Sequence, residues 1–171
     1  MMRPFLTQPP LINSLHLCRQ IDLVLVPYSD LINHTKMKED QMTIANWCVL
    51  AACVLPVLTV GLAKAGSARL ARKVGGYDNN NPRVWEQGLT GWRQRANAAQ
   101  NNGFEALPLF IAAVILAQQS HADQGRIDSL ALAFIALRVL YVAAYLMNQG
   151  TVRSLLWAGG VAASIAILVM A

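Results

Sequence analysis

Two charged side chains interrupt long apolar stretches of the sequence: Glu105 in residues 97–118 and Arg138 in residues 128–147. A charge at the centre of a membrane-spanning helix costs about 2.5–3.5 kcal/mol on insertion scales, so such a residue normally has a partner or a function. Each lies about ten residues into its stretch, which at a rise of about 1.5 Å per residue places both near mid-bilayer. We therefore expect a Glu105–Arg138 ion pair, which either only locks two helices together or forms part of a binding site.

Other polar side chains recur beside this pair at helical spacing. Asn102 lies one turn before the carboxylate, and Tyr141 and Tyr145 share a helix face with Arg138. Arg153 stands at the start of the next apolar stretch. Asn102, Tyr145 and Arg153 should meet at one depth, where amide, phenol and guanidinium groups suit an anionic, peptide-like ligand. The alternative is that the tyrosines belong to an interfacial aromatic belt and that the arginine only sets the topology.

The composition places these residues in a membrane. Hydrophobic residues make up 55% of the 171-residue chain and charged residues only 13%, whereas a soluble domain carries about 25% charged residues. The same balance excludes collagen-like and disordered classes, and the three cysteines have no metal-ligand spacing. Because a span takes about 20 apolar residues, the sequence predicts an all-α bundle of four transmembrane helices. Their approximate ranges are 43–63, 97–118, 128–147 and 152–171.

The connection after the first span concentrates the positive charge of the chain. Residues 64–95 hold seven basic side chains and two acidic ones. By the positive-inside rule this loop is cytoplasmic and both termini lie outside. Anionic lipid headgroups explain the charge better than nucleic acid does. Within the loop we expect a short interfacial helix that begins at Pro82 and presents Trp85, Leu89 and Trp92 on one face.

Residues 1–41 differ from the rest of the chain. They hold four basic and four acidic side chains, and their apolar stretches are short and interrupted. A secretory signal needs an uninterrupted apolar region of about 7–15 residues, which is not clear here. We expect residues 1–41 to be a poorly ordered extension, or the product of a start assigned upstream of Met42. Residues 42–171 are expected to form the membrane domain.

Two segments of the second and third spans resemble the signature regions of a known family. They read RANAAQNNGFEALPLF (Arg95–Phe110) and RVLYVAAYLMNQGTVRS (Arg138–Ser154). Both resemble MAPEG proteins, the membrane-associated proteins in eicosanoid and glutathione metabolism, and the sequence is most similar to the uncharacterised bacterial branch. The resemblance implies a homotrimer in a bacterial inner membrane. It also implies that glutathione binds as co-substrate between neighbouring subunits, near the cytoplasmic side.

The resemblance assigns roles to residues of the second and third spans. Asn102 and Glu105 match the family's Asn and Glu, which contact glutathione or support its site, and Arg138 matches its membrane-embedded Arg. Where the family has an Arg four residues before the Asn, this chain has Ala98. Either Arg95 reaches the ligand from further out, or one charge-assisted contact to a glutathione carboxylate is missing. That loss would cost about 10- to 150-fold in affinity.

The remaining matches lie at the end of the third span and the start of the fourth. Tyr145 matches a glutathione-binding Tyr, and Tyr141 lies where some members have His. Arg153, followed by Ser154, matches the Arg that stabilises the glutathione thiolate. A thiol with a pKa near 8.5 is mostly protonated at pH 7, and an adjacent guanidinium favours its charged form. The resemblance therefore implies a glutathione transferase or peroxidase that acts on lipophilic electrophiles or lipid hydroperoxides, with Arg153 and Tyr145 as catalytic residues.

Two other functions stay open. The family contains a member without catalytic activity, the lipoxygenase-activating protein, so a lipid-binding or partner-binding role on the same scaffold is the main alternative. A small transporter or channel is a third interpretation. Only the intramembrane charges favour it, because the sequence has no broken-helix repeat.

Overall fold

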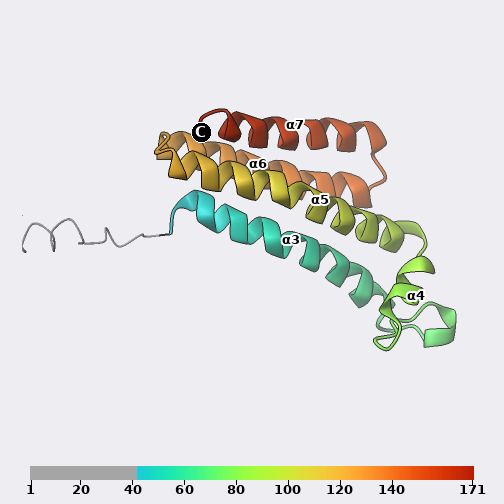
Figure 1. The fold of residues 1–171 in the computed structure, drawn as a ribbon. Coiled ribbons are helices and arrows are strands. Elements are labelled where there is room, and N and C mark those ends of the chain that lie inside the picture. The colour runs from blue at the N-terminus through green and yellow to red at the C-terminus, as the bar shows by residue number, and fades with distance from the viewer. Residues whose placement is uncertain (1–41) are drawn as a thin grey trace, which may run out of the picture. The chain divides into compact units, whose positions relative to one another are not determined.

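The computed structural model describes residues 42–171, and the expectations for residues 1–41 lie outside the described residues. The described part is helical and contains no strand. Its elements, labelled as in Figure 1, are α3 (Ile44–Ser67), the 3-10 helix η1 (Arg72–Val74), α4 (Pro82–Gln87), α5 (Gly91–Gln119), α6 (Gln124–Leu146) and α7 (Gly150–Leu168).

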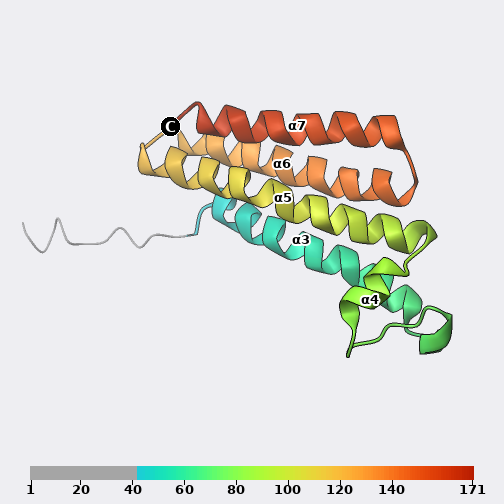
Figure 2. The same cartoon turned by 45° about the vertical axis from the view of Figure 1, so that its right-hand side comes forward.

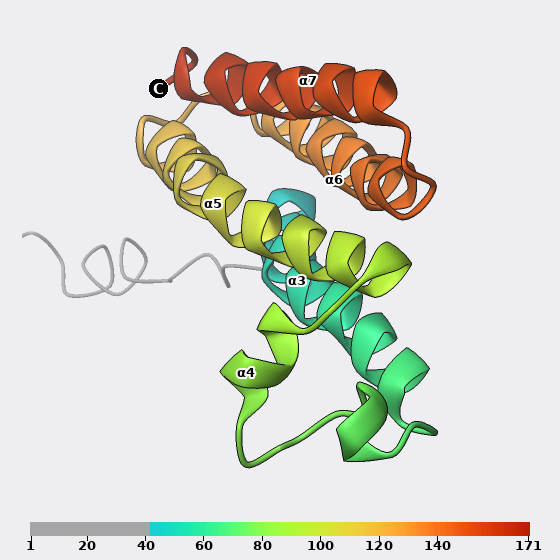
Figure 3. The same ribbon diagram turned by 90° about the vertical axis from the view of Figure 1, so that its right-hand side faces the viewer.

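The four long helices run side by side and alternate in direction (Figure 1). α5 and α6 lie at the centre, where each packs against the other three, whereas α3 and α7 lie on opposite sides (Figure 3). Helices α3, α6 and α7 are long and apolar enough to cross a membrane. The 29-residue α5 is not among these three, since the half that contains Asn102 and Glu105 is polar. Its membrane crossing stays a prediction.

Small residues and one aromatic stack hold the bundle together. The rings of Phe110 and Phe134 are parallel and 3.9 Å apart at the interface of α5 and α6. Alanines dominate the rest of the core, and small side chains let helix backbones approach closely in lipid, where the hydrophobic effect gives no net attraction. α3 and α5 approach each other closely at Pro56 and Gly103, where a Cβ on the glycine would lie 2.7 Å from the proline Cγ.

The end of the bundle at which α3 begins is joined by hydrogen bonds between helices. The Asp128 carboxylate of α6 accepts from the Ala45 backbone N–H at 2.9 Å and from the Gln124 amide at 2.7 Å. It thereby satisfies one of the unpaired donors at the N-terminus of α3. The Gln118 amide of α5 donates to the Thr43 hydroxyl at 2.9 Å. Three helices are linked at this end.

At the other end, the loop between α3 and α5 folds back against both helices (Figure 2). The short helix begins at Pro82 as predicted, and Trp85 and Leu89 are buried against Val60 and Ala96. The predicted single apolar face is wrong in one respect. The helix ends at Gln87, and Trp92 belongs to α5. α5 begins at Gly91, whose φ of +61° is a backbone conformation that glycine adopts without strain.

Candidate functional site

A bridge of hydrogen bonds through Asn102 replaces the predicted direct ion pair. The Arg138 guanidinium donates to the Asn102 amide oxygen at 3.0 Å, and the Asn102 amide nitrogen donates to the Glu105 carboxylate at 3.2 Å. The two ion pairs that the described residues do form both lie in the loop after α3. The direct pair was a wrong prediction because an amide carries both an acceptor and a donor, and Asn102 therefore fits between the two charges.

From this bridge, cations and aromatic rings continue along α6 to the start of α7. The Arg138 guanidinium lies 4.4 Å from the centre of the Tyr141 ring, and both side chains are buried. The Tyr141 and Tyr145 rings meet edge to face at 5.4 Å. The Arg153 guanidinium lies 4.5 Å from the centre of the Tyr145 ring. Each cation–ring contact contributes about 0.5–2 kcal/mol, with the larger values where water is excluded.

Tyr141, Tyr145 and Arg153 line an open groove of about 440 Å³ between α5, α6 and α7. That volume falls in the range of small-molecule sites, about 300–1,000 Å³. No hydrogen bond to another described residue occupies the Tyr141 phenol, the Tyr145 phenol or the Arg153 guanidinium, so all three can bind a ligand. The lining residues are Asn102, Tyr141, Tyr145, Arg153, Ser154, Trp157 and Ala158.

A second, more apolar crevice adjoins the groove. It has a volume of about 340 Å³ and shares Asn102 and Trp157 with the groove. Besides Asn102, its polar side chains are Glu105, Arg138 and Ser164, while Leu109, Phe134 and Val161 contribute apolar surface. The Ser164 hydroxyl is buried and donates to the Gly160 carbonyl of its own helix at 3.1 Å. A polar groove beside an apolar crevice can accept a polar ligand and a lipophilic one next to each other.

Most of the predicted site residues meet at these two spaces, but Arg95 does not. Its guanidinium donates twice to the Leu146 carbonyl at the end of α6, at 3.2 and 3.1 Å. This satisfies a backbone acceptor that the helix leaves unpaired. Ser154 lines the groove, and its hydroxyl donates to the Gly150 carbonyl at 3.2 Å. The described residues contain no group of three His, Cys, Asp or Glu side chains that could hold a metal ion.

The model of the MAPEG family matches residues 44–171, three quarters of the chain and all four long helices. The chain belongs to the MAPEG family. No curated protein and no solved structure matches it significantly. With three helices of membrane-spanning length and hydropathy, it is an integral membrane protein of this family.

Sequence reasoning missed Trp157, which contributes to both spaces of this MAPEG protein. Its side chain is 46% exposed, so the bundle does not use it as core. Trp157 follows Arg153 by four residues and therefore shares a helix face with it. That spacing is a signal that could have found it.

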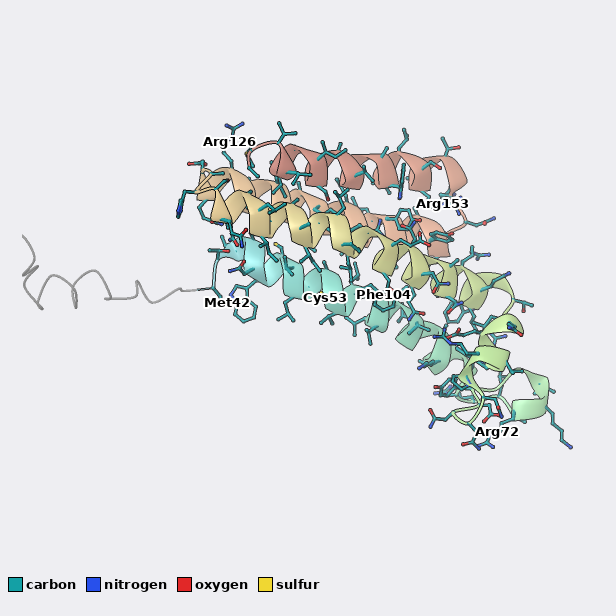
Figure 4. The ribbon with its side chains drawn as sticks, in the orientation of Figure 1. Met42, Cys53, Arg72, Phe104, Arg126 and Arg153 are labelled. Carbon is teal, nitrogen blue, oxygen red and sulfur yellow. The ribbon has the colours of Figure 1, made fainter. Side chains whose placement is uncertain are left out.

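The end of the bundle that carries Arg153 lies opposite Met42 and Arg126 (Figure 4).

Proposed function

We propose that this MAPEG protein is a glutathione-dependent transferase or peroxidase that acts on lipophilic electrophiles. The observation that carries the proposal is the Arg153 guanidinium, held over the Tyr145 ring at 4.5 Å on the wall of a groove whose phenols have no hydrogen-bond partner among residues 42–171. A cation in that setting can bind a carboxylate or stabilise a thiolate. The Asn102 amide and the Tyr141 phenol offer further polar contacts to a tripeptide.

The proposed chemistry needs no nucleophile from the protein. Arg153 lowers the pKa of the bound glutathione thiol, and Tyr145 donates a hydrogen bond to the resulting thiolate. In a transfer, the sulfur forms a bond to an electrophilic carbon, and the leaving group departs with the bonding electron pair. In a peroxidase reaction, two glutathione molecules are oxidised to their disulfide, and the lipid hydroperoxide is reduced to an alcohol and water.

The apolar crevice supports a lipophilic second substrate. It touches the groove at Asn102 and Trp157, so a molecule that enters from the bilayer would lie beside the bound sulfur. Holding two reactants side by side contributes to the rate by removing translational and rotational freedom before the reaction.

The assembly and topology are part of the same proposal. We propose a homotrimer in a bacterial inner membrane, with α5 as the fourth membrane span and glutathione bound between neighbouring subunits. The seven basic residues of the segment 64–95 favour a cytoplasmic loop, with both termini outside. The Glu105 side chain is exposed on the surface of α5 although its helix belongs to an apolar bundle. A neighbouring subunit would cover it.

A second function, lipid or partner binding without catalysis, is supported by one observation. The family's Arg position is Ala98 here, and the guanidinium of Arg95 is engaged by the Leu146 carbonyl. The groove therefore has one cation fewer for the two carboxylates of glutathione. No nucleic-acid partner is proposed.

Calorimetric titration of the detergent-solubilised full chain with glutathione separates the two functions. Saturable binding is expected, and Arg153→Gln should weaken it by about tenfold or more, because a charge-assisted contact contributes about 1.5–3 kcal/mol. Tyr145→Phe should weaken it less. The matched control is Arg126→Gln, which removes one exposed cation at the opposite end and should leave binding unchanged. No binding at millimolar glutathione would reject the enzyme and favour the second function.

A further inference from the structure

A separate cavity lies in the loop that connects α3 to α5. Its volume is about 220 Å³, far above the roughly 15 Å³ that one water needs. η1, α4 and the first turn of α5 surround it, and Arg72 marks this part of the molecule in Figure 4. The residues that line it include Arg72, Asp78, Asn81, Val84, Trp85 and Arg93. None of them belongs to the groove around Arg153.

We propose that this cavity binds the phosphodiester group of an anionic phospholipid. The site is distinct from the proposed glutathione site, and the inference does not depend on that function.

The charges of the cavity fit an anion with a single negative charge. Arg72 and Arg93 contribute two positive charges and Asp78 one negative charge, which leaves a net charge of +1. A phosphodiester carries one negative charge and neutralises this excess, whereas a phosphate dianion would leave one negative charge over. Guanidinium groups are well suited to phosphate because their N–H groups can bind two of its oxygens at once.

Both oxygens of the Asp78 carboxylate accept hydrogen bonds from the protein itself. One oxygen accepts from the Asn80 backbone N–H at 3.0 Å and the other from the Asn81 amide at 3.3 Å. These hydrogen bonds, with the nearby Arg72 cation, hold the pKa of Asp78 below its usual range, so the group is ionised at neutral pH. The Arg72 guanidinium is 3.9 Å from the carboxylate, which is too far for a hydrogen bond. Its N–H groups can therefore bind a ligand.

Arg93 adds a second guanidinium to the cavity wall. One terminal nitrogen of Arg93 donates to the Ser67 hydroxyl at 3.1 Å and lies 3.5 Å from the Gly75 carbonyl, which fixes the side chain. The other two guanidinium nitrogens have no partner among residues 42–171. The Trp85 side chain forms part of the same wall.

The position of the loop favours a lipid as the source of the phosphodiester. Trp85 packs against Val60 and Ala63, in the last two turns of α3. The cavity is thus next to the end of a membrane-length helix, where headgroups lie. Val74 and Val84 are each 67% exposed on the same loop, beside basic side chains. Apolar and basic side chains exposed together are typical of a surface that rests on an anionic membrane.

The test is calorimetry of the full chain in a neutral detergent, with dihexanoyl phosphatidylglycerol as the titrant. A soluble short-chain lipid is chosen so that the overall field of a bilayer does not contribute. Saturable binding is expected, and Arg72→Gln should weaken it about fivefold, the effect of one cation near a headgroup. The matched control is Arg69→Gln, an exposed arginine of the same loop that does not line the cavity. It should change the affinity by less than about twofold.

Asp78→Asn tests the sign of the proposal, since removing the negative charge of the cavity should strengthen lipid binding. Inorganic phosphate, added as competitor, should displace the lipid only at much higher concentration. Equal weakening by Arg72→Gln and Arg69→Gln would overturn the site in favour of diffuse attraction. Displacement by phosphate at the lipid's own concentration would overturn the lipid as the ligand. Absence of lipid binding would overturn the proposal outright.

Discussion

At the end of the bundle that carries Thr43 and Asp128, polar side chains bind one another across three helices. At the opposite end, the Arg153 guanidinium contacts the face of the Tyr145 ring. The hydrogen-bonding groups of both side chains stay free to bind a ligand in the groove. A buried polar group is costly unless it is hydrogen-bonded, so the first arrangement stabilises the fold. The second leaves hydrogen-bonding capacity for a ligand.

The Asn102 bridge lies between these two regions and shares features of both. It satisfies the buried Arg138 guanidinium, as a structural contact does, and it also lines the groove and the crevice. The comparison therefore predicts that substitutions at the Asp128 end lower stability, that substitutions at Arg153 lower activity, and that Asn102 affects both.

The largest effect is expected at Arg153. Arg153→Gln should lower glutathione-dependent turnover by about 100-fold, the loss typical of removing one group that stabilises developing negative charge. The melting temperature should change by less than about 2 °C, because the side chain has no hydrogen bond to the described protein. Turnover and thermal unfolding of the same preparation provide the measurement. A large fall in melting temperature would place Arg153 in the structural region instead.

Asn102→Leu is expected to lower the free energy of unfolding by about 2 kcal/mol, since it leaves the Arg138 guanidinium, only 4% exposed, without its side-chain acceptor. Equilibrium unfolding in mixed micelles with sodium dodecyl sulfate measures this change. Asn101→Leu is the matched control, because Asn101 is the adjacent amide of α5 and is exposed. Equal effects of the two substitutions would show that the bridge does not contribute to stability.

Gly103→Ala should cost about 1.5 kcal/mol, because the new Cβ would lie 2.7 Å from the Pro56 Cγ and force α3 away from α5. Gly61→Ala on α3 should have the opposite sign and stabilise the helix by about 0.5–1 kcal/mol, since no atom lies within 4 Å of its Cβ position. The same unfolding measurement applies to both variants. A neutral Gly103→Ala would mean that the two helices are not in close contact there.

Asp128→Ala should produce the smallest destabilisation, about 1 kcal/mol, comparable to the loss of a helix N-cap. The substitution removes the acceptor of the Ala45 N–H and of the Gln124 amide. Asp128→Asn keeps an acceptor oxygen and should recover at least half of the loss. Glutathione binding should be unaffected by either variant, and a change in binding would contradict the separation of the two ends.

Much of the fold could be predicted because its signals are local. Apolar stretches of membrane length and the helix start at Pro82 depend only on residues that are neighbours in the sequence. The spans predicted at residues 43–63 and 128–147 overlap α3 and α6 closely. The helix that contains Asn102 and Glu105 was also expected, although it begins earlier than predicted, at Gly91. Likewise, helical spacing alone placed Tyr141 and Tyr145 on the face of Arg138.

The partners of polar side chains could not be predicted in the same way. Arg95 has a long, flexible side chain that could donate to a ligand or to a backbone carbonyl. It donates to the carbonyl because the fold places Leu146 within its reach. Charges alone favoured a Glu105–Arg138 pair, but the relative position of α5 and α6 puts the Asn102 amide between them.

The sequence by itself determined that this chain is a helical membrane protein of the MAPEG family, because its composition, its hydrophobic pattern and its family motifs can all be read without coordinates. The tertiary structure alone decided which donors are bonded within the protein and which face the groove and the loop cavity. Hydrogen bonds act over about 3 Å. Shifts of one helix against another by that distance leave the sequence pattern unchanged and exchange every partner.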